Sequence, residues 1–135
     1  MDSLHLEIIT PDSRVLNTTA SYVGAPGVKG RFGVLPGHLA MLSTLEIGAV
    51  HYVAAGKTYY VFVSGGIAEV ENDKVTILTE TAESAENIDF ARAQRAAERA
   101  RQRLAARTEH VNEARAEMAL TRALVRLSLQ KPTMD

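Results

Sequence analysis

The sequence predicts an α+β protein: an N-terminal β-sandwich (flattened β-barrel) followed by a C-terminal antiparallel two-helix hairpin. Residues 3–81 form short apolar runs separated by turn-forming residues, whereas from Asp89 onward glycine is absent and apolar residues recur every three or four positions. Charge changes at the same point. Residues 1–87 hold five Lys or Arg and ten Asp or Glu, a balance of −5, and residues 88–135 hold ten and six, a balance of +4. We therefore expect two modules, residues 1–84 and 85–135.

Composition excludes several classes of protein. The 135 residues include no cysteine, so disulfides and thiolate metal sites are excluded. The first ten residues, MDSLHLEIIT, lack the basic start of a signal peptide. No apolar run approaches the roughly 18 residues that a membrane-spanning helix needs. We expect a soluble chain that reaches a membrane only through a partner.

Alternating and continuous apolar runs predict the strands. Leu4, Leu6 and Ile8 alternate with polar residues, as in a half-buried strand. Two hairpins are predicted from paired apolar runs around polar turns: Val50–Val53 with Thr58–Val63 around AAGK, and Ile67–Val70 with Val75–Leu78 around ENDK.

Glycines punctuate the segment between the first strand and the hairpins. Pro36-Gly37 is typical of a type II turn, because proline sets the first dihedral angle and glycine tolerates a positive φ at the next position. The series Gly24, Gly27, Gly30 and Gly33 lacks a strand-loop-helix context. We interpret it as a surface loop rather than a nucleotide-binding loop.

Two amphipathic helices are expected after Asp89, whose carboxylate suits an N-cap. Their apolar seams are predicted at Ala93, Ala97, Ala100 and Leu104, and at Ala116, Leu120, Leu124 and Leu127. The chain should turn near residues 107–110, with Thr108 as a candidate cap of the second helix. Because the seam is rich in alanine, each contact buries little area, and the hairpin should be weakly held.

No catalytic set is found, so we do not expect an enzyme. Gly56-Lys57-Thr58 resembles the end of a P-loop, but His51 occupies the position that requires glycine. The four histidines have no metal-ligand spacing with one another or with carboxylates, so no metal is expected. Ser64 precedes two glycines without the pattern of a nucleophile elbow.

Arginines form the most informative pattern. In a hairpin that turns near residues 108–110, Arg92 should lie opposite Arg126, and Arg99 should lie near the level of Arg122. Four guanidinium groups would then gather at the open end of the hairpin, beside Asp89. Like charges there favour an anionic ligand, and arginine suits bidentate phosphate contacts. The alternative is that the arginines only cover solvated helix faces.

Five segments together resemble the epsilon subunits of bacterial F-type ATP synthases. They are TPD at 10–12, GRFGVLPGH at 30–38, SGGIAEV at 64–70, KVTIL at 74–78 and IDFARA at 88–93. Their order and spacing match the family along nearly the whole chain. One departure is Arg31, where the family usually has an acidic residue. The resemblance implies an N-terminal β-sandwich and a C-terminal helical hairpin.

The resemblance also implies a role on the rotor of the ATP synthase. The sandwich would dock on the gamma subunit and the c-ring as a non-catalytic coupling subunit. The helical arm would permit rotation when folded down, and would inhibit ATP hydrolysis when extended toward the alpha/beta head. The implied location is the cytoplasmic side of the bacterial cell membrane, as a peripheral part of the complex.

A regulatory ATP site is implied by the match of IDFARA to the family pattern I/L-D-x-x-R-A. Ile88 and Asp89 would hold the adenine end, Ala93 would line the pocket, and Arg92 would reach the ribose or phosphates. The remaining implied contacts are Arg99, Arg122 and Arg126 to the phosphates, with Glu83 as a further lining residue.

Two other functions stay open from the sequence. One alternative is a purely structural coupling subunit without physiological ATP binding. The other is a nucleic-acid-binding module that uses its basic hairpin. Phe90 is the only aromatic residue of the arm, which disfavours nucleic-acid binding.

Overall fold

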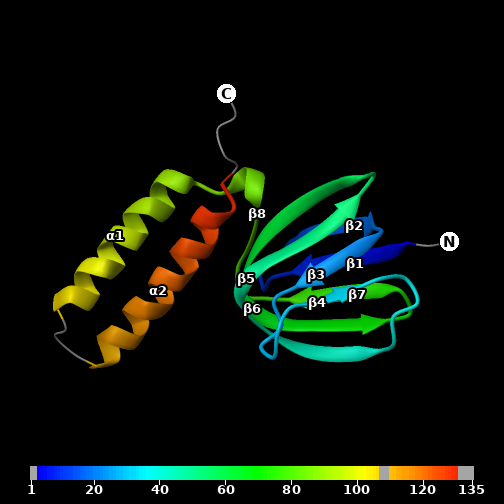
Figure 1. The fold of residues 1–135 in the computed structure, drawn as a ribbon, viewed down its shortest axis with the longest axis horizontal. Coiled ribbons are helices and arrows are strands. Elements are labelled where there is room, and N and C mark those ends of the chain that lie inside the picture. The colour runs from blue at the N-terminus through cyan, green and yellow to red at the C-terminus, as the bar shows by residue number, and fades with distance from the viewer. Residues whose placement is uncertain (1–2, 107–109, 131–135) are drawn as a thin grey trace. The chain divides into compact units, whose positions relative to one another are not determined.

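The computed structural model describes residues 3–106 and 110–130, without the side chains of residues 110–112. The chain divides into two compact units, Met1–Ala85 and Glu86–Asp135. The first unit holds the strands and the second holds the two long helices (Figure 1). The predicted α+β class, a β-sandwich followed by two helices, is confirmed.

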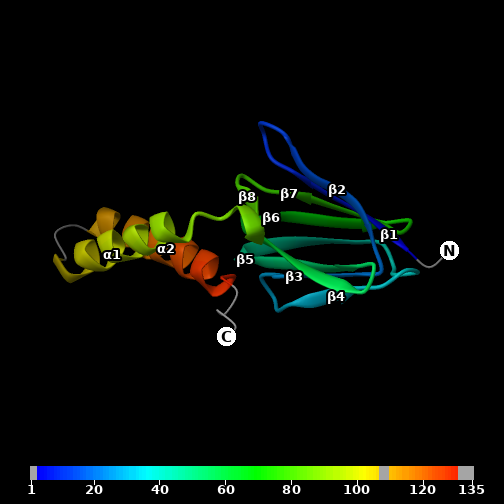
Figure 2. The same ribbon diagram turned by 90° about the horizontal axis from the view of Figure 1, so that it is seen from above.

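One sheet contains all eight strands of the described residues, in the order β2-β1-β7-β6-β5-β3-β4, with β8 paired to β6. The strands curl around a common core, as Figure 2 shows from above. The pair β1–β7 is parallel and the other pairs are antiparallel. Their bounds are β1 Leu4–Ile9, β2 Arg14–Ala20, β3 Tyr22–Ala25, β4 Phe32–Val34, β5 Met41–Ala54, β6 Lys57–Glu71, β7 Lys74–Leu78 and β8 Ala82–Ser84.

The two long strands β5 and β6 carry the sheet from one layer to the other. Residues 67–71 of β6 pair with β7, whereas residues 61–63 pair with β8. Gly65 and Gly66 lie between these two parts, with φ of 103° and 125°. A Cβ on Gly66 would collide with the carbonyl oxygen of Leu78. Glycine is therefore needed at the point where β6 changes neighbours.

Large aliphatic side chains fill the sandwich core. The alternation predicted for the first strand is confirmed, since Leu4, Leu6 and Ile8 are all buried. They pack with residues of β3, β4, β5, β6 and β7, of which the largest fully buried ones include Val23, Val34, Val50, Val61, Val63, Val70, Val75 and Ile77.

The predicted turns are confirmed by the backbone. Ala55 and Gly56 join β5 to β6, and Asn72 and Asp73 join β6 to β7, all with positive φ. Positive φ at both central residues is the signature of a type I′ hairpin turn, whose twist matches that of the strands. Gly37 has a φ of 87°, as the type II interpretation of Pro36-Gly37 requires.

The prediction that Gly24–Gly33 is a surface loop was wrong. Gly24 lies in β3 and Gly33 lies in β4, directly opposite each other in the ladder. A Cβ on Gly24 would collide with the His51 ring, and a Cβ on Gly33 would collide with Tyr22. These glycines make room for rings, so the segment is a β-hairpin with a turn only at residues 27–30.

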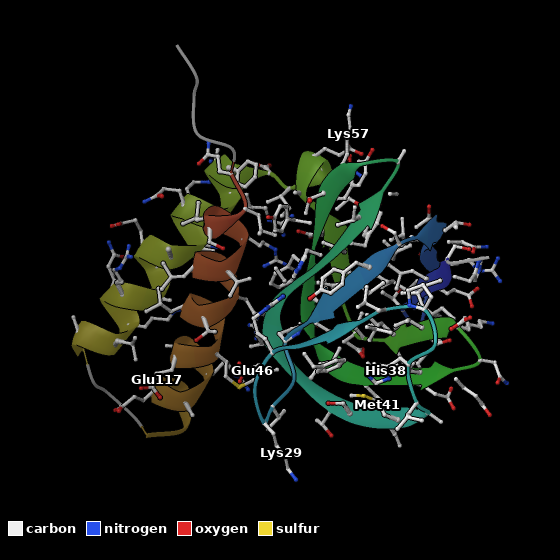
Figure 3. All side chains as sticks on the ribbon, turned by 45° about the vertical axis from the view of Figure 1, so that its right-hand side comes forward. Lys29, His38, Met41, Glu46, Lys57 and Glu117 are labelled. Atoms are coloured by element: carbon white, nitrogen blue, oxygen red, sulfur yellow. The ribbon has the colours of Figure 1, made fainter. Side chains whose placement is uncertain are left out.

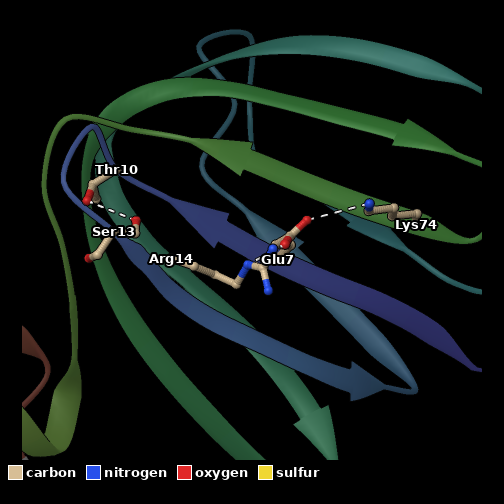
Figure 4. A network of polar contacts seen from close by, with 5 residues as sticks. All are labelled: Glu7, Thr10, Ser13, Arg14 and Lys74. Atoms are coloured by element: carbon tan, nitrogen blue, oxygen red, sulfur yellow. Dashed lines mark hydrogen bonds and ion pairs between the residues drawn. The ribbon is translucent and has the colours of Figure 1, made fainter.

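A charged group that the sequence analysis did not single out lies on β1. The Glu7 side chain is only 8% exposed and accepts from Arg14 Nε on β2 at 2.6 Å and from Lys74 Nζ on β7 at 3.5 Å (Figure 4). The ion pairs connect three adjacent strands. The nearby turn is closed where Thr10 Oγ1 donates to the carbonyl oxygen of Ser13 at 3.2 Å.

The helical unit begins with a 3-10 turn, Ala85–Asn87, and continues as α1, Phe90–Ala106, and α2, His110–Ser128. The seam predicted for α1 is confirmed at its three alanines, which are buried. On α2 the buried residues are Ala116 and Ala123, whereas Leu124 is 41% exposed. The seam of α2 therefore passes through Ala123, one residue before the predicted position. Thr108 lies outside the described residues.

Candidate functional site

The start of α1 is an N-cap, as the sequence predicts. Asp89 Oδ1 accepts from the backbone N–H of Arg92 at 3.0 Å, and the Asp89 carbonyl oxygen accepts from the N–H of Ala93 at 3.0 Å. The side-chain bond satisfies an amide of the first turn that has no intrahelical partner, and the carbonyl accepts the first backbone hydrogen bond of the helix. Asp89 itself is exposed, and the preceding Ile88 is 6% exposed. The capped turn therefore holds a carboxylate in solvent beside the first arginine of the helix.

Two candidate phosphate ligands lie on α1. Arg92 and Arg99 are seven residues apart, hence on one face, and both are exposed. Ala93 is 5% exposed and belongs to the alanine seam of the helix. Ala93 thus serves packing, and it can offer at most the edge of its methyl group to a ligand.

The other two candidate arginines, Arg122 and Arg126, are half-buried on α2. The helix bounds place Phe90 and Ser128 at the open end of the hairpin, opposite the turn that joins the helices. At a rise of 1.5 Å per residue, Arg92 and Arg126 each lie about 3 Å along the axis from that end. Arg99 and Arg122 lie about 13 Å and 9 Å from it. Four guanidinium groups therefore fall within about 11 Å of axial length.

Glu83 belongs to the other unit. It lies in β8, opposite Phe62 of β6. Thr81, just before β8, makes two hydrogen bonds to Ser64 of β6. Its N–H donates to Ser64 Oγ at 2.9 Å, and its carbonyl oxygen accepts from the N–H of Ser64 at 3.0 Å. Glu83 is thus held by the sandwich, and its role in the predicted site stays a prediction.

The four candidate arginines of the hairpin suit an anionic ligand. Guanidinium groups donate in a fixed fork that matches phosphate oxygens, and they stay charged at any physiological pH. Among the described residues, no group of three or more His, Asp or Glu side chains is placed to hold a metal ion. The donors present fit a nucleotide triphosphate bound through its phosphates.

A second candidate surface lies on the sandwich, and the sequence analysis missed it. Large apolar side chains are exposed in and around the segment 28–42, with Leu39 83% and Leu42 72% exposed. Val28 and Leu35 are also exposed. His38 and Met41, which belong to this segment, are labelled in Figure 3. The sequence contains a signal for this surface. Apolar residues in a turn-rich segment predict a contact surface when they do not fill the buried face of a strand.

Also on the sandwich, Arg31 connects the β3–β4 hairpin to β5. Its guanidinium NH2 group donates to the Ala49 carbonyl oxygen at 3.0 Å and contacts His51 Nδ1 at 3.1 Å. Burial, and to a smaller extent the charge of Arg31, lower the pKa of His51 below its ordinary value. The neutral imidazole can accept from Arg31, and it lies between the rings of Tyr22 and Tyr60, at centroid distances of 5.5 and 5.9 Å.

The family described as ATP synthase, Delta/Epsilon chain, beta-sandwich domain matches residues 3–85, and the corresponding long alpha-helix domain matches residues 86–130. An ATP synthase epsilon chain of Nitratidesulfovibrio vulgaris is 58% identical over 95% of this chain and 96% of its own length. That of Lawsonia intracellularis is 53% identical over 94% and 96%.

Two solved structures of ATP synthases contain chains with a similar fold. A chain in the Euglena gracilis mitochondrial ATP synthase, in a structure of its OSCP/F1/c-ring, matches with a TM-score of 0.80 and 26% identity, over 90% of this chain and 78% of that one. A chain of the Tetrahymena thermophila enzyme, from its central stalk and c-ring, matches with a TM-score of 0.59 and 12% identity, over 93% and 94%, which supports the fold alone. In the part of the chain that the structure describes, neither helix is long and apolar enough to cross a membrane.

Proposed function

The chain belongs to the delta/epsilon chain family of the ATP synthase, and we propose that it is a non-catalytic stalk subunit whose helical hairpin responds to ATP. The sandwich would bind the gamma subunit and the c-ring, on the cytoplasmic side of a bacterial membrane. The hairpin would inhibit ATP hydrolysis when it extends toward the alpha/beta head.

The exposed apolar surface of the sandwich supports the docking part of this proposal. Four large apolar residues between Val28 and Leu42 are more than half exposed, on a unit whose interior is otherwise filled by aliphatic side chains. Burial of such side chains in an interface contributes roughly 25 cal/mol per Å² of apolar area. The structural relative with 26% identity comes from an assembly that contains the c-ring, which favours rotor subunits as the partners.

The ATP part is supported by the positions of the four candidate arginines, which lie about 3 to 13 Å along the axis from the open end of the hairpin, where Asp89 caps α1. A triphosphate between the helices would neutralise Arg92, Arg99, Arg122 and Arg126. Ile88 and Asp89 would contact the adenine end. Because this site needs both helices, ATP would bind only the closed hairpin and would shift the population toward it by its differential affinity. A fall in ATP would release the arm.

Calorimetric titration of the full chain with ATP tests this proposal. We expect Arg92→Ala and Arg126→Ala each to weaken ATP binding by about ten- to a hundredfold, the loss of one charge-assisted hydrogen-bonded contact. Arg101→Ala is the matched control, because Arg101 pairs with Glu98 at 3.4 Å and is not among the four arginines. Equal affinity in all three variants would exclude the clamp.

The competing function is a purely structural coupling subunit. In that case the docking surface of the sandwich would still serve, but titration of the wild-type chain with millimolar ATP would give no heat. A nucleic-acid-binding module would instead give salt-dependent binding to RNA or DNA. Neither is favoured by a particular observation.

A further inference from the structure

The last strand of the sandwich is held by a short ladder. β8 has three residues, Ala82–Ser84, and among the described strands it pairs with β6 alone. The ladder consists of three residue pairs, which join Val61–Val63 of β6 to β8 in antiparallel register. A strand with one neighbour and three pairs receives little cooperative support, so it can separate from the sheet without unfolding the rest.

The side chains of β8 contribute little to the core. All three residues are half-buried, and Ala82 packs its methyl group against the core cluster. A single methyl group buries little apolar area. The facing residues of β6 are held differently, because Val61 and Val63 belong to the core cluster and also pair with Val50 and Gly48 of β5. Separation of β8 would therefore leave β6 in place.

Just before β8 the chain is bound more firmly. The N–H of Thr81 donates to Ser64 Oγ at 2.9 Å, and the N–H of Ser64 donates to the Thr81 carbonyl oxygen at 3.0 Å. Thr79 is 6% exposed, and its hydroxyl donates to the Thr81 carbonyl oxygen at 3.3 Å. The N–H of Thr79 donates to the Ile9 carbonyl oxygen at 3.0 Å. We call Ser64, Thr79 and Thr81 the clasp, and it resists opening because its polar groups would lose their partners away from water.

The clasp and β8 directly precede the helical unit in the chain. The 3-10 turn Ala85–Asn87 follows Ser84 at once, and the second compact unit begins at Glu86. A force that the helical unit exerts on the chain therefore acts first on β8 and then on the clasp. At 3.3 Å per residue, three residues of extended strand supply about 10 Å of chain.

We propose that β8 is a detachable strap, which separates from β6 when the helical arm extends, and that the clasp stops the separation at Thr81. The moving part of the chain then begins at Ala82, and residues 82–84 join the linker. The inference rests on the proposed function, in which the arm changes its position, and adds a mechanical element to it. Release of the arm includes the release of one strand of the sandwich.

Hydrogen exchange of the full chain, followed amide by amide by NMR, tests the strap. Since the N–H of Ser64 donates to Thr81, alternation along β6 directs the N–H of Phe62 to β8 and the N–H groups of Val61 and Val63 to β5. Opening of β8 alone exposes the Phe62 amide. After correction for intrinsic rates, this amide should exchange at least a hundredfold faster than those of Val61, Val63 and Ser64. Equal rates would overturn the proposal, because β8 would then open only together with the sheet.

A disulfide between β6 and β8 provides a matched pair of states. The chain has no cysteine, so Val61→Cys/Ser84→Cys can form one defined bond between two residues that face each other in the ladder. By the same alternation this pair is non-hydrogen-bonded, with Cα atoms about 4.5 Å apart, which a disulfide can span. Oxidation should slow the exchange of the Phe62 amide at least tenfold, and reduction should restore it. Because both states belong to one variant, the loss of the core valine affects them equally. An unchanged rate on oxidation would contradict the separation of β8.

Ser64→Ala tests the clasp. The N–H of residue 64 can still donate to the Thr81 carbonyl oxygen, but Thr81 loses the hydroxyl that accepts from its own N–H. The amide of residue 64 should then exchange at least tenfold faster, as the opening passes the former stop. Ser43→Ala is the control, because the Ser43 hydroxyl donates to the adjacent Thr44 carbonyl oxygen at 3.3 Å and takes no part in the clasp. If residue 64 exchanges equally slowly in both variants, the clasp is not the stop.

ATP distinguishes this inference from the proposed function. In a chain that binds ATP, saturating ATP should slow the exchange of the Phe62 amide, as the disulfide does. If the chain binds no ATP, the regulatory function fails, whereas the exchange pattern still decides whether β8 is detachable. If ATP binds and the Phe62 amide exchanges as before, β8 does not move with the arm and the strap is excluded.

Discussion

The two units of this chain are stabilised by side chains of very different size. The sandwich buries Leu, Ile, Val and Phe side chains that are at most 1% exposed, each contributing roughly 1.5–3 kcal/mol. The hairpin buries chiefly Ala93, Ala97, Ala100, Ala116 and Ala123 between its helices. A buried alanine methyl contributes less than about 1 kcal/mol. The proposed control of hairpin closure by ATP requires this difference, because a weakly packed hairpin can open while the sandwich stays folded.

The largest expected effect is in the sandwich core. Ile77→Ala should lower the free energy of unfolding by about 2–5 kcal/mol, because the buried side chain leaves a cavity among Val and Leu residues. All four tyrosines lie between residues 22 and 60 and the chain has no tryptophan, so tyrosine fluorescence during urea unfolding reports on the sandwich. Leu124→Ala is the control on the hairpin, since Leu124 is 41% exposed. Similar losses in both variants would contradict the comparison.

The second prediction concerns the corner of β6. Gly66→Ala should lower the free energy of unfolding by about 2–4 kcal/mol, because a Cβ there collides with the Leu78 carbonyl oxygen and the residue keeps a φ of 125°. Gly30 is a matched control, with a φ of 126° and no atom within 4 Å of an added Cβ. Gly30→Ala should therefore cost only the dihedral strain, about 1 kcal/mol. Equal costs would show that backbone strain alone explains the glycine.

The third prediction is smaller and concerns the hairpin. Asp89→Ala removes the cap of α1 and should lower the stability of the helix by about 1 kcal/mol. Asp89→Asn keeps an acceptor for the N–H of Arg92 and should restore most of the loss. Helical circular dichroism during thermal unfolding measures both. Because Asp89 is also a proposed adenine contact, weaker ATP binding in Asp89→Asn at unchanged helicity would separate the two roles of the residue.

Local signals explain what the sequence predicted. The two predicted hairpin turns, the Pro36-Gly37 turn and the N-cap at Asp89 depend on backbone angles and amides within a few residues, and all were found. The α1 seam also followed from its own period. On α2, Leu124 competed with Ala123 for the seam, and larger apolar size favoured the wrong residue because packing depends on the rotation of one helix against the other.

Long-range contacts explain what the sequence missed. Gly24 is glycine because the ring of His51, far along the chain, lies over it. Glu7 is buried because Arg14 and Lys74 reach it from two neighbouring strands. The candidate arginines could be assigned to helix faces from spacing alone. Their approach across the hairpin depends on the length of the turn, which spacing within one helix does not determine.

The smallest expected effect is a pH dependence of the sandwich. The folded pKa of His51 is lowered from 6.5, first by burial and then by Arg31, so the folded state binds fewer protons than the unfolded state below pH 6.5. The stability contribution of neutral His51 is therefore fully present above pH 6.5 and is lost as the pH falls from 6.5 through the lowered folded pKa.

Replacement of Arg31 tests the cause. In Arg31→Ala the pKa of His51, followed by NMR titration of its ring, should rise but stay below 6.5, because burial is the larger cause. Lys29→Ala removes a cation from the same hairpin without touching the ring and should leave the titration unchanged. Loss of the Arg31 contact should also raise the hydrogen exchange of the β3–β4 amides, because its guanidinium connects that hairpin to β5 at Ala49. If the pKa of His51 is unchanged in Arg31→Ala, burial alone lowers it, and the contact of Arg31 with His51 contributes to packing only.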